Sequence, residues 1–177
     1  MTKMLNLLRF NRAVVAESGQ ATVEFYFVGI TLIVIMFGLI DFGRFIYERQ
    51  VMVNLSREGA NLAARATPLS NTVAAVITSA APLNLNTKGR AIASQVFNDG
   101  KNLIVTNQFS QGGLSVSSKI GLLGSKSAKV PSTSPAIPRT QQSLYAVEVF
   151  YTFTPITPVG KLLKFTLPSQ IYDVAYF

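Results

Sequence analysis

The stretch ESGQATVEFYFVGITLIVIMFG, from Glu17 to Gly38, decides how the N-terminal part of this 177-residue chain folds. It places a single acid, Glu24, directly before an apolar run that continues without a charge from Phe25 to Ile40. Counted from Gln20 to Ile46, the run has the roughly 20 residues that a helix needs to cross a bilayer. We therefore expect a transmembrane helix over residues 20–46.

The charges before the apolar run predict its orientation. Lys3, Arg9 and Arg12 precede it against one acid, Glu17, and a positive flank remains on the cytoplasmic side of a membrane. A secretory signal peptide ends in small residues after its apolar core, whereas this run is followed by DFGRFIYERQ. We expect residues 1–19 to be a cytoplasmic leader, the helix to be retained, and the rest of the chain to be periplasmic.

Composition argues against most kinds of active site. The chain has no cysteine and no histidine, which excludes disulfides, thiolate metal sites, cysteine nucleophiles and most hydrolytic triads and zinc sites. The eight acids are spread over the whole chain, and we find no glycine-rich phosphate loop and no nucleophile beside a base. We expect no enzymatic activity, no metal and no cofactor.

The formal net charge of +8 does not by itself indicate a nucleic-acid-binding protein. Lysine and arginine are scattered through the chain without a dense run. We attribute them to solubility and membrane topology rather than to a nucleic-acid-binding patch.

A second, amphipathic helical half is expected beyond the membrane, over residues 47–67. There is no proline from Phe42 to Ala66, and Pro68 disfavours helical geometry in Thr67. Four apolar side chains fall within about 60° on a helical wheel. They are Val51, Leu55, Leu62 and Ala66. This stripe is expected to pack on a globular head. Asp41 and Arg44, three residues apart, would share one helix face as an ion pair or as a contact between subunits.

Residues 68–177 are expected to form an α+β head. Short helices are predicted over Thr72–Ala81 and Thr87–Phe97, the second ending at the turn signal Asn98-Asp99-Gly100. A β-hairpin is predicted from Leu103–Phe109 and Leu114–Ile120, joined by Ser-Gln-Gly-Gly.

The clearest strand is Leu144–Phe153, LYAVEVFYTF. Alternate residues from Tyr145 to Phe153 are apolar and line one face of the strand, and Glu148 and Thr152 lie on the opposite face. This row is expected to be the core face of the sheet, and binding of single-stranded nucleic acid is the alternative. Segments 161–167 and 170–177 could each add a strand. Residues 124–143, rich in Ser, Pro and Ala, are expected to be a flexible loop, with adhesion as an alternative role.

The order of these N-terminal features resembles that of type IV prepilins. A basic leader ends at Gly19, and cleavage there would make Gln20 the first residue and put Glu24 and Phe25 at the fifth and sixth positions. GQATVEF is most similar to the tight-adherence (Tad) branch, and GLIDFGRFIYERQVMVNLSREGANLAARA is similar to the TadE-like pseudopilins. Gly19 and Gln20 are the expected processing site, and Glu24 and Phe25 the expected assembly residues.

The resemblance implies a pilin-like fold, in which a long N-terminal helix packs on a small antiparallel sheet. It implies cleavage by a prepilin peptidase, insertion in the bacterial inner membrane, and partners among other pilins and the pilus assembly platform. Glu24 would meet the new α-amino group of a neighbouring subunit and so set the subunit register. Filaments of this class serve surface attachment and biofilm formation.

Two other hypotheses remain open at this point. The protein could be a DNA-binding pseudopilin of an uptake or secretion system, which salt-dependent DNA binding would reveal. It could also be a membrane-anchored periplasmic protein that never polymerises, with an uncleaved helix and Glu24 in the headgroup layer.

Overall fold

The computed structural model describes the backbone of residues 2–130, 138–162 and 168–177, and the side chains of residues 19–130, 138–161 and 168–177. The chain divides into two compact units. One contains Met1–Gly43 with Pro155–Leu163, and the other contains Arg44–Thr154 with Lys164–Phe177. Each unit is described by itself.

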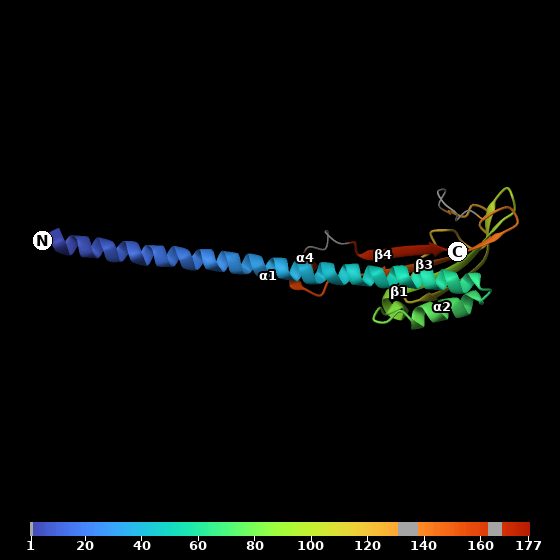
Figure 1. Ribbon diagram of the computed structural model, residues 1–177, viewed down its shortest axis with the longest axis horizontal. Coiled ribbons are helices and arrows are strands. Elements are labelled where there is room, and N and C mark those ends of the chain that lie inside the picture. The colour runs from blue at the N-terminus through green and yellow to red at the C-terminus, as the bar shows by residue number, and fades with distance from the viewer. Residues whose placement is uncertain (1, 131–137, 163–167) are drawn as a thin grey trace. The chain divides into compact units, whose positions relative to one another are not determined.

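The long helix α1, Thr2–Ala64, belongs to the first unit as far as Gly43 and to the second unit from Arg44 onward (Figure 1). Its part from Gly19 onward is long and apolar enough to cross a membrane, with a mean hydropathy of 2.3 over the most apolar 18 residues and none of that window buried. The apolar N-terminal helix expected from the sequence is therefore confirmed. The short helix α4, Pro158–Leu162, belongs to the first unit.

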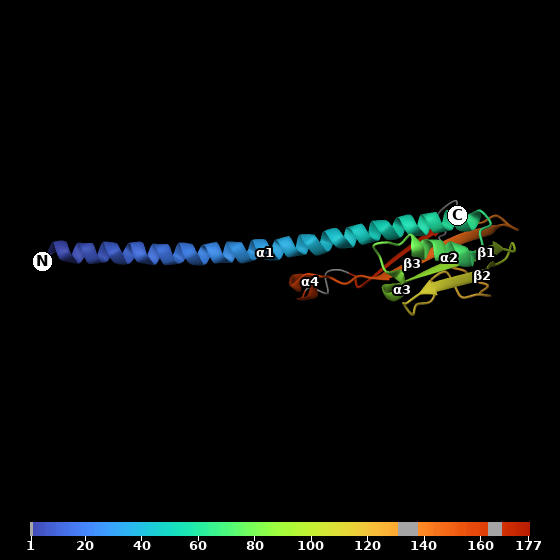
Figure 2. The same cartoon turned by 90° about the horizontal axis from the view of Figure 1, so that it is seen from below.

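The second unit is built on one antiparallel sheet of four strands. These are β1 (Gly89–Asn98), β2 (Leu103–Gly112), β3 (Ser143–Thr152) and β4 (Gln170–Tyr176), in the spatial order β2-β1-β3-β4. The last part of α1 and the helices α2 (Leu69–Thr78) and α3 (Leu85–Lys88) supply buried residues to one face of the sheet (Figure 2). The predicted α+β class, a long helix packed on a small antiparallel sheet, is confirmed.

The seam between α1 and the sheet consists mainly of small residues and differs from the predicted stripe. Of that stripe only Leu55 is buried, and Ala66 lies beyond the helix end, exposed and with a φ of 60°. A Cβ at Gly59 would lie 2.7 Å from Val76 Cγ2 and 3.0 Å from Val147 Cγ1, so glycine permits this close approach. The buried residues of α1 on this seam follow the helical period. They are Met52, Leu55, Ser56, Gly59, Ala60 and Ala63.

The predicted helix Thr87–Phe97 is wrong, because these residues form most of the central strand β1. It pairs with β2 on one edge and with β3 on the other. Alanine, lysine, arginine and glutamine favour helix in isolation, but the two ladders outweigh this weak preference. Ala91 and Ala93 are fully buried in the core cluster that α1 and α2 share, where small side chains let the helices lie close.

The predicted hairpin is also wrong in its second strand. The turn at Asp99 and Gly100 joins β1 to β2, and Leu114–Ile120 is not a strand. Instead, Ile120 is buried against the second face of the sheet with Val96, Val105 and Ala146. Helix α2 begins at Leu69, three residues before the predicted start, and Leu69 is buried in the core.

The prediction of a strand at Leu144–Phe153 is confirmed by β3, and Gln170–Phe177 supplies β4. The row from Val147 to Phe153 lies in the core with Tyr145 packed against it, so this row is the core face of the sheet. The strand predicted over 161–167 falls partly on α4, and residues 163–167 lie outside the described part of the chain.

Part of the predicted loop 124–143 runs along β2. The Ala128 amide donates to the Leu103 carbonyl at 2.9 Å, and the Lys129 amide donates to the Ile120 carbonyl at 2.7 Å. Residues 131–137 lie outside the described residues, so the flexible loop remains a prediction.

Candidate assembly and membrane site

The predicted processing and assembly residues lie on one exposed stretch of α1. Gln20 Nε2 donates a hydrogen bond to Glu24 Oε1 at 3.0 Å, one helical turn away, and both side chains are exposed. A Cβ at Gly19 would meet no atom within 4 Å. Glu24 therefore has a local partner that leaves its carboxylate accessible to another chain.

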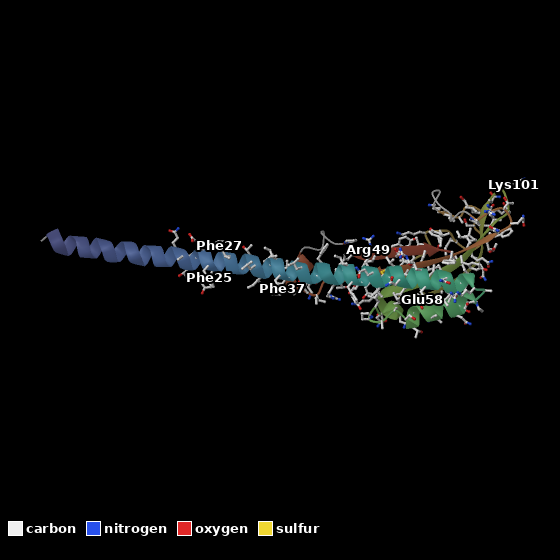
Figure 3. All side chains as sticks on the ribbon, in the orientation of Figure 1. Phe25, Phe27, Phe37, Arg49, Glu58 and Lys101 are labelled. Carbon is white, nitrogen blue, oxygen red and sulfur yellow. The ribbon has the colours of Figure 1, made fainter. Side chains whose placement is uncertain are left out.

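The surface of α1 beyond Glu24 is apolar around its whole circumference. Phe25 is 74% exposed, Phe27 is 72% exposed and Leu39 is 66% exposed, and the phenylalanine side chains project from the helix (Figure 3). A helix that is apolar on every side requires an apolar environment. This stretch is therefore suited to lipid, and also to packing against helices of its own kind.

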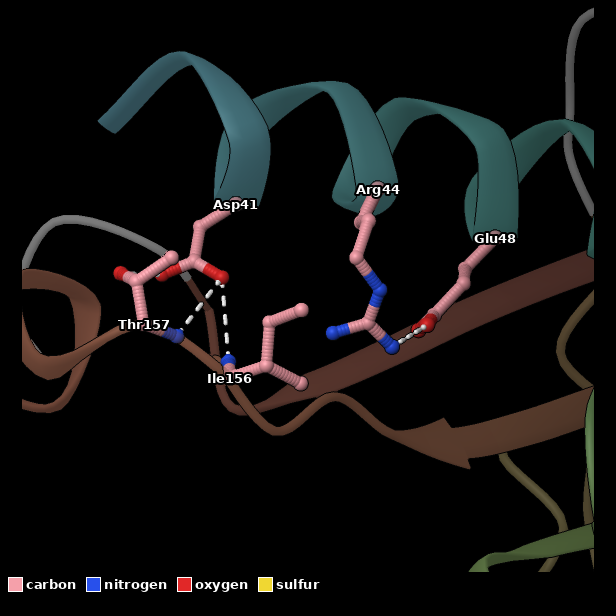
Figure 4. Close-up of polar contacts among 5 residues, drawn as sticks. All are labelled: Asp41, Arg44, Glu48, Ile156 and Thr157. Carbon is pink, nitrogen blue, oxygen red and sulfur yellow. Dashed lines mark hydrogen bonds and ion pairs between the residues drawn. The ribbon is translucent and has the colours of Figure 1, made fainter. Parts of the chain in front are cut away.

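Asp41, directly after the apolar run, is buried and hydrogen-bonded within the first unit. Asp41 is 2% exposed, because Ile156, Thr157 and Gly160 of the same unit lie against its carboxylate. The amides of Ile156 and Thr157 donate hydrogen bonds to Asp41 Oδ1 at 3.0 and 3.4 Å, and the Thr157 hydroxyl donates to Asp41 Oδ2 (Figure 4). One carboxylate thus holds two successive backbone donors and a side-chain donor.

Gly160 completes this contact. A Cβ at this position would lie 1.9 Å from Asp41 Oδ2 and 2.7 Å from Pro155 Cβ, so any other residue would displace the carboxylate. The Gly160 amide donates to Thr157 Oγ1 at 3.0 Å. Thr157 therefore links the acid of α1 to the first turn of α4.

Arg44 belongs to the second unit and forms an ion pair with Glu48, at 2.8 Å between Nη2 and Oε1. The Glu48 side chain is 7% exposed, and burial raises its pKa against the opposing effects of Arg44 and Lys88. Arg44 Nη1 and Glu48 Oε2 have no hydrogen-bond partner among the described residues. The predicted pairing of Asp41 with Arg44 remains a prediction.

A buried acid in the sheet was missed by the sequence analysis. Glu148 was assigned to a polar face of β3, but it is fully buried. Its carboxylate accepts hydrogen bonds from the Ser118 hydroxyl, from the Lys119 amide at 2.8 Å and from the Tyr172 hydroxyl at 3.0 Å. Burial, followed by the charge of Glu148, raises the pKa of Tyr172. Glu148 is the single acid in the apolar run LYAVEVF, and this position is the sequence feature that could have indicated its burial.

Comparison with known protein families identifies the segment that carries the candidate site. Residues 19–61 match the family model described as TadE-like protein. The match confirms the resemblance noted in the sequence, over roughly a quarter of the chain. Searches of curated proteins and of solved structures gave no match.

The TadE-like segment begins at Gly19 and ends within α1. It includes Glu24, the exposed apolar run and Asp41, and it continues into the small-residue seam as far as Ala60. The match thus covers the apolar part of the helix and the part that packs on the sheet. The chain is therefore similar to TadE-like proteins over this segment, which contains a helix long and apolar enough to cross a membrane.

Proposed function

We propose that this protein is a minor pilin (pseudopilin) of a Tad-type type IV pilus, with a structural rather than a catalytic role. The observation that carries the proposal is the exposed apolar helix, with Glu24 at its start, inside the TadE-like match. In this role the subunit contributes to a filament that serves surface attachment and biofilm formation.

The proposed location is the bacterial inner membrane. The cations Lys3, Arg9 and Arg12 keep the N-terminus cytoplasmic, and the sheet unit is then periplasmic. The apolar part of α1 holds the subunit in the membrane until assembly extracts it.

Processing by a prepilin peptidase after Gly19 is the proposed first step. Cleavage would create an α-amino group on Gln20, which is largely charged at neutral pH. A cation at a helix N-terminus is opposed by the helix macrodipole, whereas an acid in the first turn is favoured. Glu24 lies one turn from the new terminus and accepts a hydrogen bond from the Gln20 side chain.

Assembly is the proposed second step. When apolar helices pack side by side, Glu24 of one subunit is buried together with the terminal amine of a neighbour. Each charge then offsets the desolvation of the other, and a misaligned subunit would leave a buried charge unpaired, at a cost of about 3–5 kcal/mol. The pair therefore selects the register of the filament.

The test compares Glu24→Ala with Glu58→Ala, which removes an exposed acid of α1 outside the apolar run. Both variants are expressed in the native cell, and the amount of protein is measured in membranes and in sheared surface filaments. We expect Glu24→Ala to reach the membrane normally and to be lost from filaments, with Glu58→Ala unaffected. Normal incorporation of Glu24→Ala would contradict the assembly role.

A further inference from the structure

The connection between β3 and β4 carries a short segment, Pro155–Lys161, that the function proposed above does not use. It belongs to the same unit as the apolar helix, and Asp41 fixes it at the point where the apolar run ends. Ile156 is 57% exposed although its own amide and the amide of Thr157 donate hydrogen bonds to Asp41 of the helix. An exposed isoleucine on a firmly held loop requires an explanation.

We propose that Pro155–Lys161 is a second membrane contact, which inserts Ile156 into the boundary between headgroups and acyl chains of the outer leaflet. The proposal rests on the membrane anchoring of α1 proposed above. The partner that this segment contacts is a membrane surface with anionic headgroups.

The first support is position. Asp41 directly follows Ile40, which is 42% exposed, and Phe42 is 51% exposed on the same part of α1. The hydrogen bonds of Asp41 hold the Ile156 backbone beside these residues. If the apolar run lies in lipid, Ile156 is at the level of the interface and continues the apolar surface of the helix.

The second support is the hydrogen bonding of the segment. Backbone N–H groups without partners are costly near hydrocarbon, and this segment has few to satisfy. Pro155 and Pro158 have no N–H group. The amides of Ile156 and Thr157 donate to the Asp41 carboxylate. The Gly160 amide donates to the Thr157 hydroxyl, and the Lys161 amide donates to the Thr157 carbonyl. Most of the N–H groups of the segment are therefore already paired, which lowers the cost of approaching lipid.

The third support is charge. Lys161 is exposed in the last turn of α4, and no acid occurs from Pro155 to Lys161. Apolar side chains combined with a cation are typical of segments that lie in the membrane interface. Lys161 is suited to lipid phosphates while Ile156 and the half-buried Val159 face the acyl chains.

The experiment uses the absence of cysteine from the native chain. The full-length variant Ile156→Cys is labelled with an environment-sensitive fluorophore and reconstituted in vesicles of phosphatidylcholine and phosphatidylglycerol. Ile33→Cys, at the middle of the apolar run, and Lys101→Cys, in the turn between β1 and β2, are labelled in the same way. Depth is measured by quenching with lipids that carry a nitroxide at the headgroup or deep in the acyl chain.

We expect the label at position 156 to show a blue-shifted emission and to be quenched most by the headgroup nitroxide. The label at position 33 should be quenched by the deep nitroxide, and the label at position 101 by neither. Adding Asp41→Ala should remove the quenching at position 156, because the segment is then no longer held at the helix.

Two results would overturn the proposal and leave the membrane anchor intact. One is a label at position 156 that behaves like the label at 101, while position 33 remains deep. The other is shielding at position 156 that appears only at high protein density with cross-linking between copies, which would indicate a protein contact. If position 33 is also solvent-exposed, the anchoring itself is wrong, and the proposal fails with it.

Discussion

The carboxylate of Asp41 accepts a hydrogen bond from the hydroxyl of Thr157, which lies 116 residues further along the chain. This contact joins the end of the apolar run to the connection between β3 and β4. It explains how an acid beside a long apolar segment is 2% exposed without remaining an unpaired charge. The acid is thus a structural acceptor for a loop that the sequence places far away.

Replacing Asp41 is expected to release this loop. Asp41→Ala removes the acceptor of the Ile156 and Thr157 amides, and hydrogen bonds to a charged acceptor contribute about 1.5–3 kcal/mol each. Hydrogen exchange of these two amides in detergent-solubilised protein should accelerate by roughly ten- to a hundred-fold. Asp41→Asn, which keeps one acceptor oxygen, should have a smaller effect. Unchanged protection in Asp41→Ala would show that the loop is held by other contacts.

Gly160→Ala is expected to disturb the same contact by crowding. The added Cβ would lie 1.9 Å from Asp41 Oδ2, whereas a Cβ at Gly43, close to Asp41 on α1, would meet no atom within 4 Å. Overpacking of this kind costs about 1–3 kcal/mol. Limited proteolysis should cleave Gly160→Ala near residue 160 faster than the wild type, and Gly43→Ala at the wild-type rate. Equal rates for all three proteins would contradict the tight fit.

Glu148 is expected to be a principal stabilising residue of the sheet unit. Glu148→Ala leaves the buried donors of Ser118, Lys119 and Tyr172 without an acceptor, at a cost of about 3–5 kcal/mol. Urea denaturation followed by circular dichroism measures this loss. The matched control Glu58→Ala, an exposed acid, should change stability by less than about 0.5 kcal/mol. Similar midpoints for the two variants would contradict the role of Glu148.

Alkaline pH is expected to destabilise the sheet unit through Tyr172. Burial and the charge of Glu148 raise its pKa above the ordinary value of 10.0, so the unfolded chain loses this proton at a lower pH than the folded chain. Below pH 10 the phenol is neutral in both states. Above it, the free energy of unfolding falls as pH rises. Urea titrations between about pH 9 and 11 should show a shallower fall for Tyr172→Phe than for the wild type. Identical slopes would exclude Tyr172 as the cause.

Local sequence patterns predicted the helix and the strand whose apolar periodicity is visible within the segment itself. The apolar run from Phe25 to Ile40 predicted the exposed apolar part of α1, because a helix of residues that are apolar on every side is recognisable from the sequence alone. The alternation in Leu144–Phe153 predicted β3. The alternation did not reveal that the second face of β3 is covered too, so Glu148 was placed in solvent although it is fully buried.

Elements that depend on distant partners were not predictable in the same way. Strand β1 has helix-favouring residues, and only its pairing with β2 and β3 makes it a strand. The contact between Asp41 and Thr157 likewise depends on the path of the whole chain. Asp41 was named in the sequence analysis for its spacing of three residues from Arg44, because local spacing suggests partners on the same helix and not Thr157.

The most direct test of the pilin account is the N-terminus of the protein isolated from its native cell. Intact-mass and terminal-peptide spectrometry should find Gln20 as the first residue, with residues 1–19 removed and the apolar helix retained. Detection of Met1 on the mature protein, or of a terminus beyond the apolar run, would contradict the account.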